Sequence, residues 1–142
     1  MKNKIAIGAD HAGYKLKGEL VSFLEEKGYT VIDYGCPSEE SIDYPDYAHR
    51  VAKKVKLSKN YVGILICGSG TGMNIAANKH KNIRAAQCFN LKSTKLSRLH
   101  NDANIITLGS RLITKKNAIK FVSIFLNTAF DGGRHEKRIK KI

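Results

Sequence analysis

The chain has 142 residues, the length of one ordinary domain and enough to bury a substantial core. Apolar residues make up 42% of the sequence and are spread along it, which excludes a disordered polypeptide. No apolar run is long enough to cross a bilayer, and the N-terminus enters a strand pattern without the hydrophobic region of a signal peptide. We therefore expect one cytoplasmic domain over residues 1–142 that does not bind a membrane.

The net charge is +13, because 25 Lys and Arg stand against 12 Asp and Glu. Such a charge attracts anions, and nucleic acid is the first of these to consider. However, aromatic residues do not interleave with the basic ones, and no nucleic-acid-binding motif is present. Many lysines fit solvent-exposed helix faces, and a phosphorylated small metabolite accounts for the arginines equally well. We expect a phosphorylated small-molecule partner and no nucleic acid.

The cysteines Cys36, Cys67 and Cys88 form no C-x-x-C pair, and their odd number leaves one unpaired in any disulfide scheme. We expect free thiols in a reducing compartment, with Cys36 and Cys88 in structural positions. No spacing of histidine with cysteine or with another histidine is typical of a metal site. The sequence therefore predicts no structural or catalytic metal and no cofactor.

The first half of the chain predicts a strand, a helix and a second strand, followed by a long loop, a helix and a third strand. The strands are expected over residues 4–9, 29–34 and 62–67, and the helices over 14–27 and 47–56. Gly28 supplies the stop of the first helix. Two parallel strands joined by a helix require a right-handed crossover.

The second half continues the alternation. It predicts helices over residues 73–79, 91–100 and 114–127, and strands over 83–88 and 104–108. Five strands thus alternate with five helices, which predicts a Rossmann-like, doubly wound three-layer α/β/α sandwich with a five-stranded parallel sheet. In such folds, ligands bind outside the carboxyl ends of the strands, near the point where the strand order reverses.

Chemically capable residues follow several predicted strand ends. They are Asp10 and His11, the run C-G-S-G-T-G at 67–72, Asn90, and Gly109 to Arg111. The glycine run is no dinucleotide fingerprint, because Met73 or Ile75 stands where the third glycine belongs, and no Gly-Lys-Ser/Thr follows.

Cysteine is often buried as a small hydrophobe. Here, however, glycines let the backbone turn tightly beside Cys67, and the first free N–H groups of the next helix would surround the sulfur. We therefore interpret Cys67 as a reactive thiol at the end of the central strand.

Two further features lie outside the strand ends. Residues 98–104 form a dense polar cluster where a helix meets a strand, and a histidine such as His100 is commonly a helix cap there. The tail at 131–142 begins with two glycines, and Arg134 and Arg138 would share one helix face suited to a phosphate. Taken alone, these arginines fit a solvated basic tail.

Seven blocks of the sequence together resemble the type B ribose-5-phosphate isomerases. In chain order the blocks are G-A-D-H-A-G at 8–13, D-Y-P-D at 43–46, C-G-S-G-T-G at 67–72, I-A-A-N-K at 75–79, H-N-D-A-N at 100–104, L-G-S-R at 108–111 and G-G-R-H at 132–135. Any single block is weak, but seven in the family's order and approximate spacing are a strong match. The resemblance runs over nearly the full chain.

The resemblance implies a metal-independent isomerisation of ribose 5-phosphate and ribulose 5-phosphate, a step of the non-oxidative pentose phosphate pathway, through a cis-enediolate. By resemblance, Cys67 moves the proton between C2 and C1, His100 opens the furanose ring, and Asp10 and Ser69 contact hydroxyls or assist the proton shuttling. The backbone amides of the glycine loop hold the enediolate oxygen, and the remaining carried-over residues bind the substrate: His11, Tyr44, Gly68, Gly70, Thr71, Gly72, Asn101, Arg111, Arg134 and Arg138.

The resemblance also implies a homodimer or tetramer whose active site takes residues from two chains, with the basic tail at 131–142 packed on the partner subunit. The sequence fits the cysteine type of the family, because Cys67 is present and Met73 stands where other members carry a glutamate base. It departs from many members at Leu99, where they carry an acid before the histidine. The alternatives are an isomerase of a six-carbon sugar phosphate, such as allose or galactose 6-phosphate, and a non-catalytic nucleic-acid or sugar-phosphate binding module.

Overall fold

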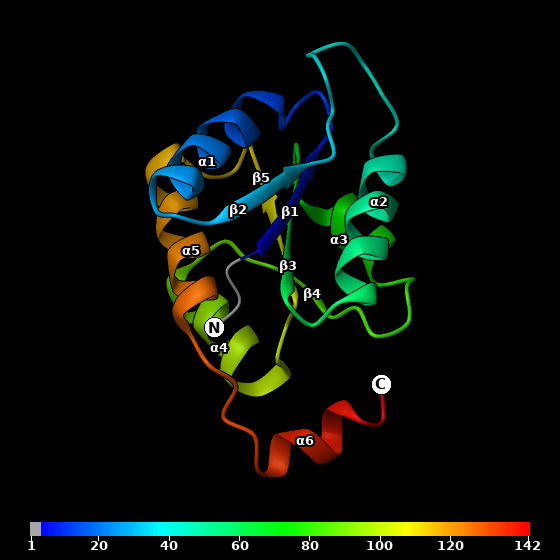
Figure 1. The fold of residues 1–142 in the computed structure, drawn as a ribbon, viewed down its shortest axis with the longest axis vertical. Coiled ribbons are helices and arrows are strands. Elements are labelled where there is room, and N and C mark those ends of the chain that lie inside the picture. Colours follow the sequence, from blue (N-terminus) through cyan, green and yellow to red (C-terminus); the bar gives the residue numbers. More distant parts are fainter. Residues whose placement is uncertain (1–3) are drawn as a thin grey trace.

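The computed structural model describes residues 4–142, which form one central sheet with helices on both faces (Figure 1). The strands are β1 (Lys4–Ala9), β2 (Thr30–Asp33), β3 (Tyr61–Cys67), β4 (Ala85–Gln87) and β5 (Ile105–Gly109). The helices are α1 (Tyr14–Glu26), α2 (Tyr44–Leu57), α3 (Thr71–Ala77), α4 (Leu91–Asn101), α5 (Lys115–Asn127) and α6 (Arg134–Ile139).

The sheet has the strand order β2-β1-β3-β5-β4, and every neighbouring pair is parallel. The order reverses between β1 and β3, since the chain continues from β1 outward to β2 but from β3 toward β5 and β4. The predicted doubly wound α/β/α sandwich with a five-stranded parallel sheet is thereby confirmed. In such folds, ligands bind outside the carboxyl ends of the strands where the order reverses, so we expect a binding site at the ends of β1 and β3.

Alternation along the strands builds two separate cores. In β3, Ile64 and Ile66 face one core, which α1 and α5 cover with Leu20 and Phe125, whereas Leu65 faces the other core. This second core is covered by α2 and α3, and Cys67 belongs to it. Side chains two apart in a strand point to the same face, so Cys67 lies on the α2/α3 side of the sheet.

The loops at the carboxyl edge pack without room for side chains. A Cβ at Gly13 would lie 2.6 Å from the carbonyl oxygen of Ile66, and one at Gly109 would lie 2.6 Å from that of Ser69. Real Cβ atoms do not come that close, so glycine is required for these backbones to touch. The first contact joins the turn after β1 to the end of β3.

Some element boundaries differ from those expected. Helix α2 begins at Tyr44, because Pro45 in the first turn needs no backbone N–H donor there. Strand β4 is only three residues long. The basic tail is a sixth helix, α6, and none of its residues is buried on its own chain. In Figure 1 this helix lies apart from the sandwich, beyond the amino ends of the strands.

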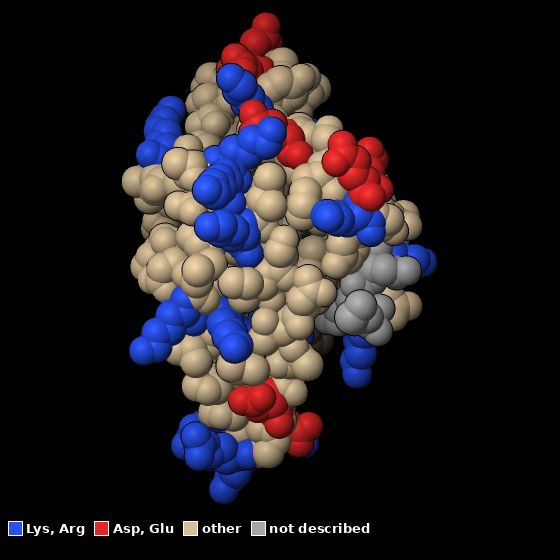
Figure 2. Space-filling model, turned by 90° about the vertical axis from the view of Figure 1, so that its left-hand side faces the viewer, with Lys and Arg blue, Asp and Glu red and all other residues tan. Residues whose placement is uncertain are grey.

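The surplus of basic residues is spread out. Figure 2 shows Lys and Arg in separate groups over one face, with acidic groups between them and one group at the end of the molecule where α6 lies. Within residues 4–142, no helix combines the length and apolar character needed to span a membrane.

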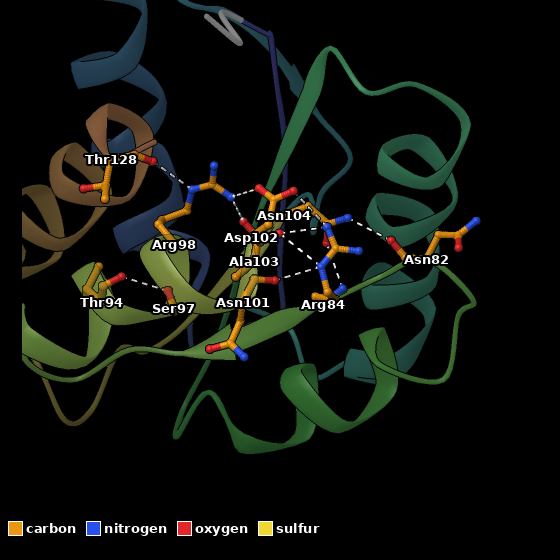
Figure 3. A network of polar contacts seen from close by, with 10 residues as sticks. All are labelled: Asn82, Arg84, Thr94, Ser97, Arg98, Asn101, Asp102, Ala103, Asn104 and Thr128. Atoms are coloured by element: carbon orange, nitrogen blue, oxygen red, sulfur yellow. Dashed lines mark hydrogen bonds and ion pairs between the residues drawn. The ribbon is translucent and has the colours of Figure 1, made fainter. Parts of the chain in front are cut away.

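A polar network fixes the end of α4 (Figure 3). Asp102 follows the helix in the left-handed conformation, with φ +44°, and its carboxylate accepts from Arg98 at 2.8 Å and from Arg84 at 3.3 Å. Arg84 also donates to the backbone carbonyls of Asn101 and Asp102. Asn104 ties the same region to β4, because its side-chain oxygen accepts from the Arg84 N–H at 2.9 Å. The network thereby holds the segment that carries His100.

We predict that Asp102→Asn lowers the free energy of unfolding by about 1–2 kcal/mol, because two partly buried arginines lose their counter-charge. The matched control is Glu19→Gln, which removes a pair with Lys115 at 3.9 Å whose lysine is largely exposed. That control should cost under about 0.5 kcal/mol. Urea unfolding of both variants measures the difference, and equal losses would contradict the role given to Asp102.

A pair of histidines joins α2 to the residues that follow α3, on the face of the sheet that these two helices cover. Nδ1 of His49, in α2, lies 2.7 Å from Nε2 of His80, which follows α3, so one ring donates to the other. The pKa of His80 is lowered, first by partial burial and then by the positive charges of His49, Lys56 and Lys53. The folded state therefore favours the neutral ring of His80.

We predict that this pair makes stability pH-dependent. Because the pKa of His80 in the folded protein lies below its unfolded value of about 6.5, its contribution is complete above pH ~6.5 and is lost as the pH falls through the folded pKa. Thermal unfolding between pH 7.5 and 5 should show this loss, and His80→Gln should flatten it. An unchanged slope in His80→Gln would assign the pH dependence to other groups.

Candidate active site

The sulfur of Cys67 lies in a tight turn at the carboxyl end of β3. The residue is 4% exposed, and its Sγ accepts a hydrogen bond from the Gly70 N–H at 3.1 Å. Gly70 has φ +81° and is the cap residue that starts α3. Because this conformation strains any residue with a Cβ, glycine allows the loop to fold back over the sulfur. The expected strand, tight loop and helix are thus confirmed.

The glycine loop is enclosed by two predicted site residues. A Cβ at Gly68 would lie 3.0 Å from Nη1 of Arg111, and one at Gly72 would lie 2.5 Å from Cζ of Tyr44. The guanidinium and the phenol ring therefore rest directly against the loop backbone. Arg111 is fixed there because its own N–H donates to the Gly68 carbonyl at 3.0 Å.

Asp10 and His11 lie on the neighbouring strand end. The Asp10 N–H donates to the Ile66 carbonyl at 3.1 Å, and its Oδ1 accepts from the Gly13 N–H at 3.0 Å. Asp10 is only 6% exposed. Nδ1 of His11 accepts from the Ile42 N–H at 3.3 Å, so a neutral His11 carries its proton on Nε2. Both side chains are therefore oriented by backbone groups at the point where the strand order reverses.

Gln87 is a site residue that the sequence analysis missed. Its Nε2 donates to the Ser69 carbonyl at 2.8 Å and to Oγ1 of Thr71 at 3.1 Å. The Ser69 hydroxyl also accepts from the Thr71 N–H at 3.3 Å. Gln87 ends β4, two strands away from β3, and no local motif marks it; only the strand order reveals that it supports the loop.

The other two cysteines are buried, as expected for structural positions. Burial raises the pKa of the Cys36 and Cys88 thiols, which keeps them in the less reactive protonated form.

A second group of predicted site residues lies at the opposite edge of the sheet. His100 and Asn101 end α4, Arg138 lies on α6, and together they line an open cavity of about 400 Å³. Arg134 begins α6. The network around Asp102 fixes the backbone immediately after His100 and Asn101 (Figure 3).

His100 has two neighbours that the sequence analysis did not select. The ring of His135 stacks on it, with centroids 4.4 Å apart and 16° between the planes. Asp131 is the other neighbour, since one ligand atom from each of His100, Asp131 and His135 lies within 4.8 Å of the others. The pKa of His135 is lowered, first by desolvation and then by the positive charges of His100, Arg134 and Arg138.

The two groups cannot meet within one chain. Cys67 pairs with Gly109 at the end of β5, whereas His100 precedes the start of β5 at Ile105. The strand between these levels spans about 13 Å, at roughly 3.3 Å per residue. The chain thus brings Asp10, His11, Tyr44, the glycine loop and Arg111 together, and separately His100, Asn101, Arg134 and Arg138.

Comparison with known proteins identifies relatives over nearly the whole chain. The family model described as Ribose/Galactose Isomerase matches residues 5–142. Ribose-5-phosphate isomerase B of Escherichia coli is 47% identical over 139 residues, which cover 98% of this chain and 93% of the relative. D-erythrulose-4-phosphate isomerase of Pectobacterium atrosepticum is 42% identical, with 97% and 91% covered.

Solved structures agree with this assignment. A ribose 5-phosphate isomerase from Thermotoga maritima has a TM-score of 0.96 at 49% identity and covers 99% of this chain and 97% of its own. Ribose-5-phosphate isomerase B from Mycoplasma genitalium, solved with bound ribulose 5-phosphate, has a TM-score of 0.94 at 44% identity, with 97% and 92% covered. The resemblance noted in the sequence is confirmed, and the chain belongs to the ribose/galactose isomerase family of isomerases.

Proposed function

We propose that the protein interconverts D-ribose 5-phosphate and D-ribulose 5-phosphate. The observation that carries this proposal is the buried Cys67 thiol, which accepts the Gly70 N–H where the strand order reverses. A thiolate there would be a base beside an amide donor, which suits proton removal next to a carbonyl. The Escherichia coli and Mycoplasma genitalium relatives, by name and by bound ligand, support the five-carbon substrate.

Ring opening is the first step of the proposed reaction. The proton of the O1 hydroxyl leaves, the bond between C1 and the ring oxygen breaks, and the ring oxygen gains a proton. An imidazole can take one proton and return another, and His100 is assigned this role. The step yields the open aldehyde with no change of oxidation state.

Cys67 then removes the proton from C2, and the electron pair forms a C1–C2 double bond with negative charge on O1. Amide donors of the glycine loop stabilise this oxygen, each by about 3 kcal/mol. The sulfur returns the proton to C1, while the O2 proton passes to O1, with Asp10 and Ser69 assisting between the hydroxyls. The product is the ketose, and every proton lost has been returned.

The phosphate group anchors the substrate in the proposed site. Arg111 lies against the glycine loop, and His11 follows Asp10 at the end of the neighbouring strand. Arg134 and Arg138 lie on one face of α6, where guanidinium groups can bind phosphate in bidentate fashion. Binding energy from this remote group positions C1 and C2.

We further infer that each active site is completed by a partner subunit, in a homodimer or tetramer. The distance between Cys67 and His100 along the sheet supports this, as does α6, which buries none of its residues on its own chain. Exposed apolar side chains at the carboxyl edge, Phe89 and Leu112, offer surface for that partner. The tail at 131–142 then packs on the second subunit, and the buried free thiols suit a reducing cytoplasm.

A six-carbon or four-carbon sugar phosphate is the alternative substrate. The Pectobacterium atrosepticum relative, whose name gives a four-carbon substrate, supports the four-carbon alternative. The family model, whose description includes galactose, supports the six-carbon one. The alternative substrates would use the same bases and the same phosphate site. They differ from ribose 5-phosphate in the length of pocket that they need.

We predict that Cys67→Ala abolishes the exchange of the C2 proton of ribose 5-phosphate with solvent deuterium. Proton NMR measures this exchange. Binding of the substrate, measured by calorimetry, should change little because the phosphate contacts remain. Ser22→Ala, in α1, is the control and should exchange like wild type. Exchange retained in Cys67→Ala would exclude this base, and a higher kcat/KM on four- or six-carbon phosphates would favour the alternative.

Complementation tests the shared site. Cys67→Ala and His100→Gln are each expected to be inactive, but co-expressed chains form mixed dimers in which one site has both native residues. Random pairing should restore about one quarter of the wild-type sites. No recovery in isolated mixed dimers would mean that one chain supplies both residues.

A further inference from the structure

Three side chains of the types that ligate metal ions meet outside the glycine loop. His100 comes from the last turn of α4, Asp131 from the linker before α6, and His135 from the first turn of α6. One ligand atom of each lies within 4.8 Å of the other two. Within residues 4–142, no other group of three or more His, Cys, Asp or Glu meets this condition.

The chain holds these side chains together by its own backbone. The Asp131 N–H donates to the Leu99 carbonyl at 3.1 Å, which ties the linker to the turn before His100. Gly132 and Gly133 then adopt φ +68° and +58°, a left-handed turn that brings His135 back over His100. The cluster is therefore built by a hydrogen bond and a glycine turn.

The donor set suits one class of cation. Two imidazole nitrogens and one carboxylate oxygen are typical ligands of Zn²⁺, with nickel and cobalt as close alternatives, whereas Mg²⁺ and Ca²⁺ prefer oxygen alone. Ligands around a tetrahedral Zn²⁺ lie about 3.4 Å apart, given bonds of roughly 2.1 Å. The three ligand atoms, which lie within 4.8 Å of one another, would have to move closer by side-chain rotation, and the open cavity beside His100 and His135 leaves room for water as a fourth ligand.

We propose that His100, Asp131 and His135 bind a divalent transition-metal ion of the Zn²⁺ class. The ion must replace the stacking of the two rings and must withstand the charges of Arg134 and Arg138, so the site should be weaker than a structural zinc site. If the function proposed above holds, the bound ion occupies the nitrogen of His100 that opens the sugar ring. It would then act as a reversible inhibitor of the proposed isomerisation.

The His49–His80 pair is the alternative candidate for metal binding. These rings lie 2.7 Å apart but have lysines, Lys53 and Lys56, as their charged neighbours in place of a carboxylate. This pair therefore supplies a control in the same protein.

Metal binding is tested without reference to activity. The purified protein, stripped by chelator, is titrated with Zn²⁺ by calorimetry and with Co²⁺ by visible absorption. Asp131→Asn and His135→Gln should weaken binding more than the roughly tenfold that loss of an outer partner costs. Asp131→Glu should retain binding, which guards against loss through misfolding, and His80→Gln should bind like wild type.

Three outcomes overturn the proposal. The first is equal affinity in wild type, Asp131→Asn and His135→Gln, and the second is loss of binding in His80→Gln alone. The third is a thiolate-to-cobalt charge-transfer band, which would assign the ion to a cysteine.

Inhibition is a separate measurement. Zn²⁺ should inhibit wild type at least tenfold more strongly than Asp131→Asn, each relative to its own metal-free rate. A protein that binds Zn²⁺ as predicted but isomerises no sugar phosphate would refute the proposed function and leave the metal site standing.

Discussion

The site depends on close backbone contact between the turn after β1, the loop after β3 and the end of β5. Gly13, Gly70 and Gly109 each place backbone where a Cβ would lie within 3 Å of a neighbouring backbone atom. These contacts bring Asp10, Cys67 and the 67–72 loop to one place and leave the sulfur buried beside an amide donor. Because the contacts are backbone to backbone, enlarging a side chain at any of them forces the loop itself to move.

A parallel sheet imposes a second constraint, because its carboxyl and amino edges lie on opposite sides of the domain. Helix α4 runs back against the strands and delivers His100 to the amino edge, while β3 delivers Cys67 to the carboxyl edge. One chain cannot bend to join them without unpairing β5. In the oligomer proposed above, the carboxyl edge of one copy would meet the amino edge of another, and twofold symmetry would complete two sites at once.

The sequence predicted what is local. The apolar run ending at Cys67, the glycines after it and the alternation of strands and helices all follow from short-range pattern, and the structure agrees. The contacts of Gln87 and Arg84 were not predicted, because their partners lie far away along the chain. Arg98 and Asp102, in contrast, are four residues apart and belong to the polar cluster noted at 98–104. The start of α2 at Tyr44 was missed although Pro45 signals a first helical turn.

Leu99 illustrates how a fold can supply from elsewhere what the local sequence lacks. Many relatives of the resembled type carry an acid before the histidine, and this chain has leucine there. The backbone carbonyl of Leu99, however, accepts the N–H of Asp131, so a carboxylate thirty-one positions away arrives beside His100. The backbone contact that returns Asp131 to the neighbourhood of His100 is therefore also the contact that assembles the donor set proposed above for a metal ion.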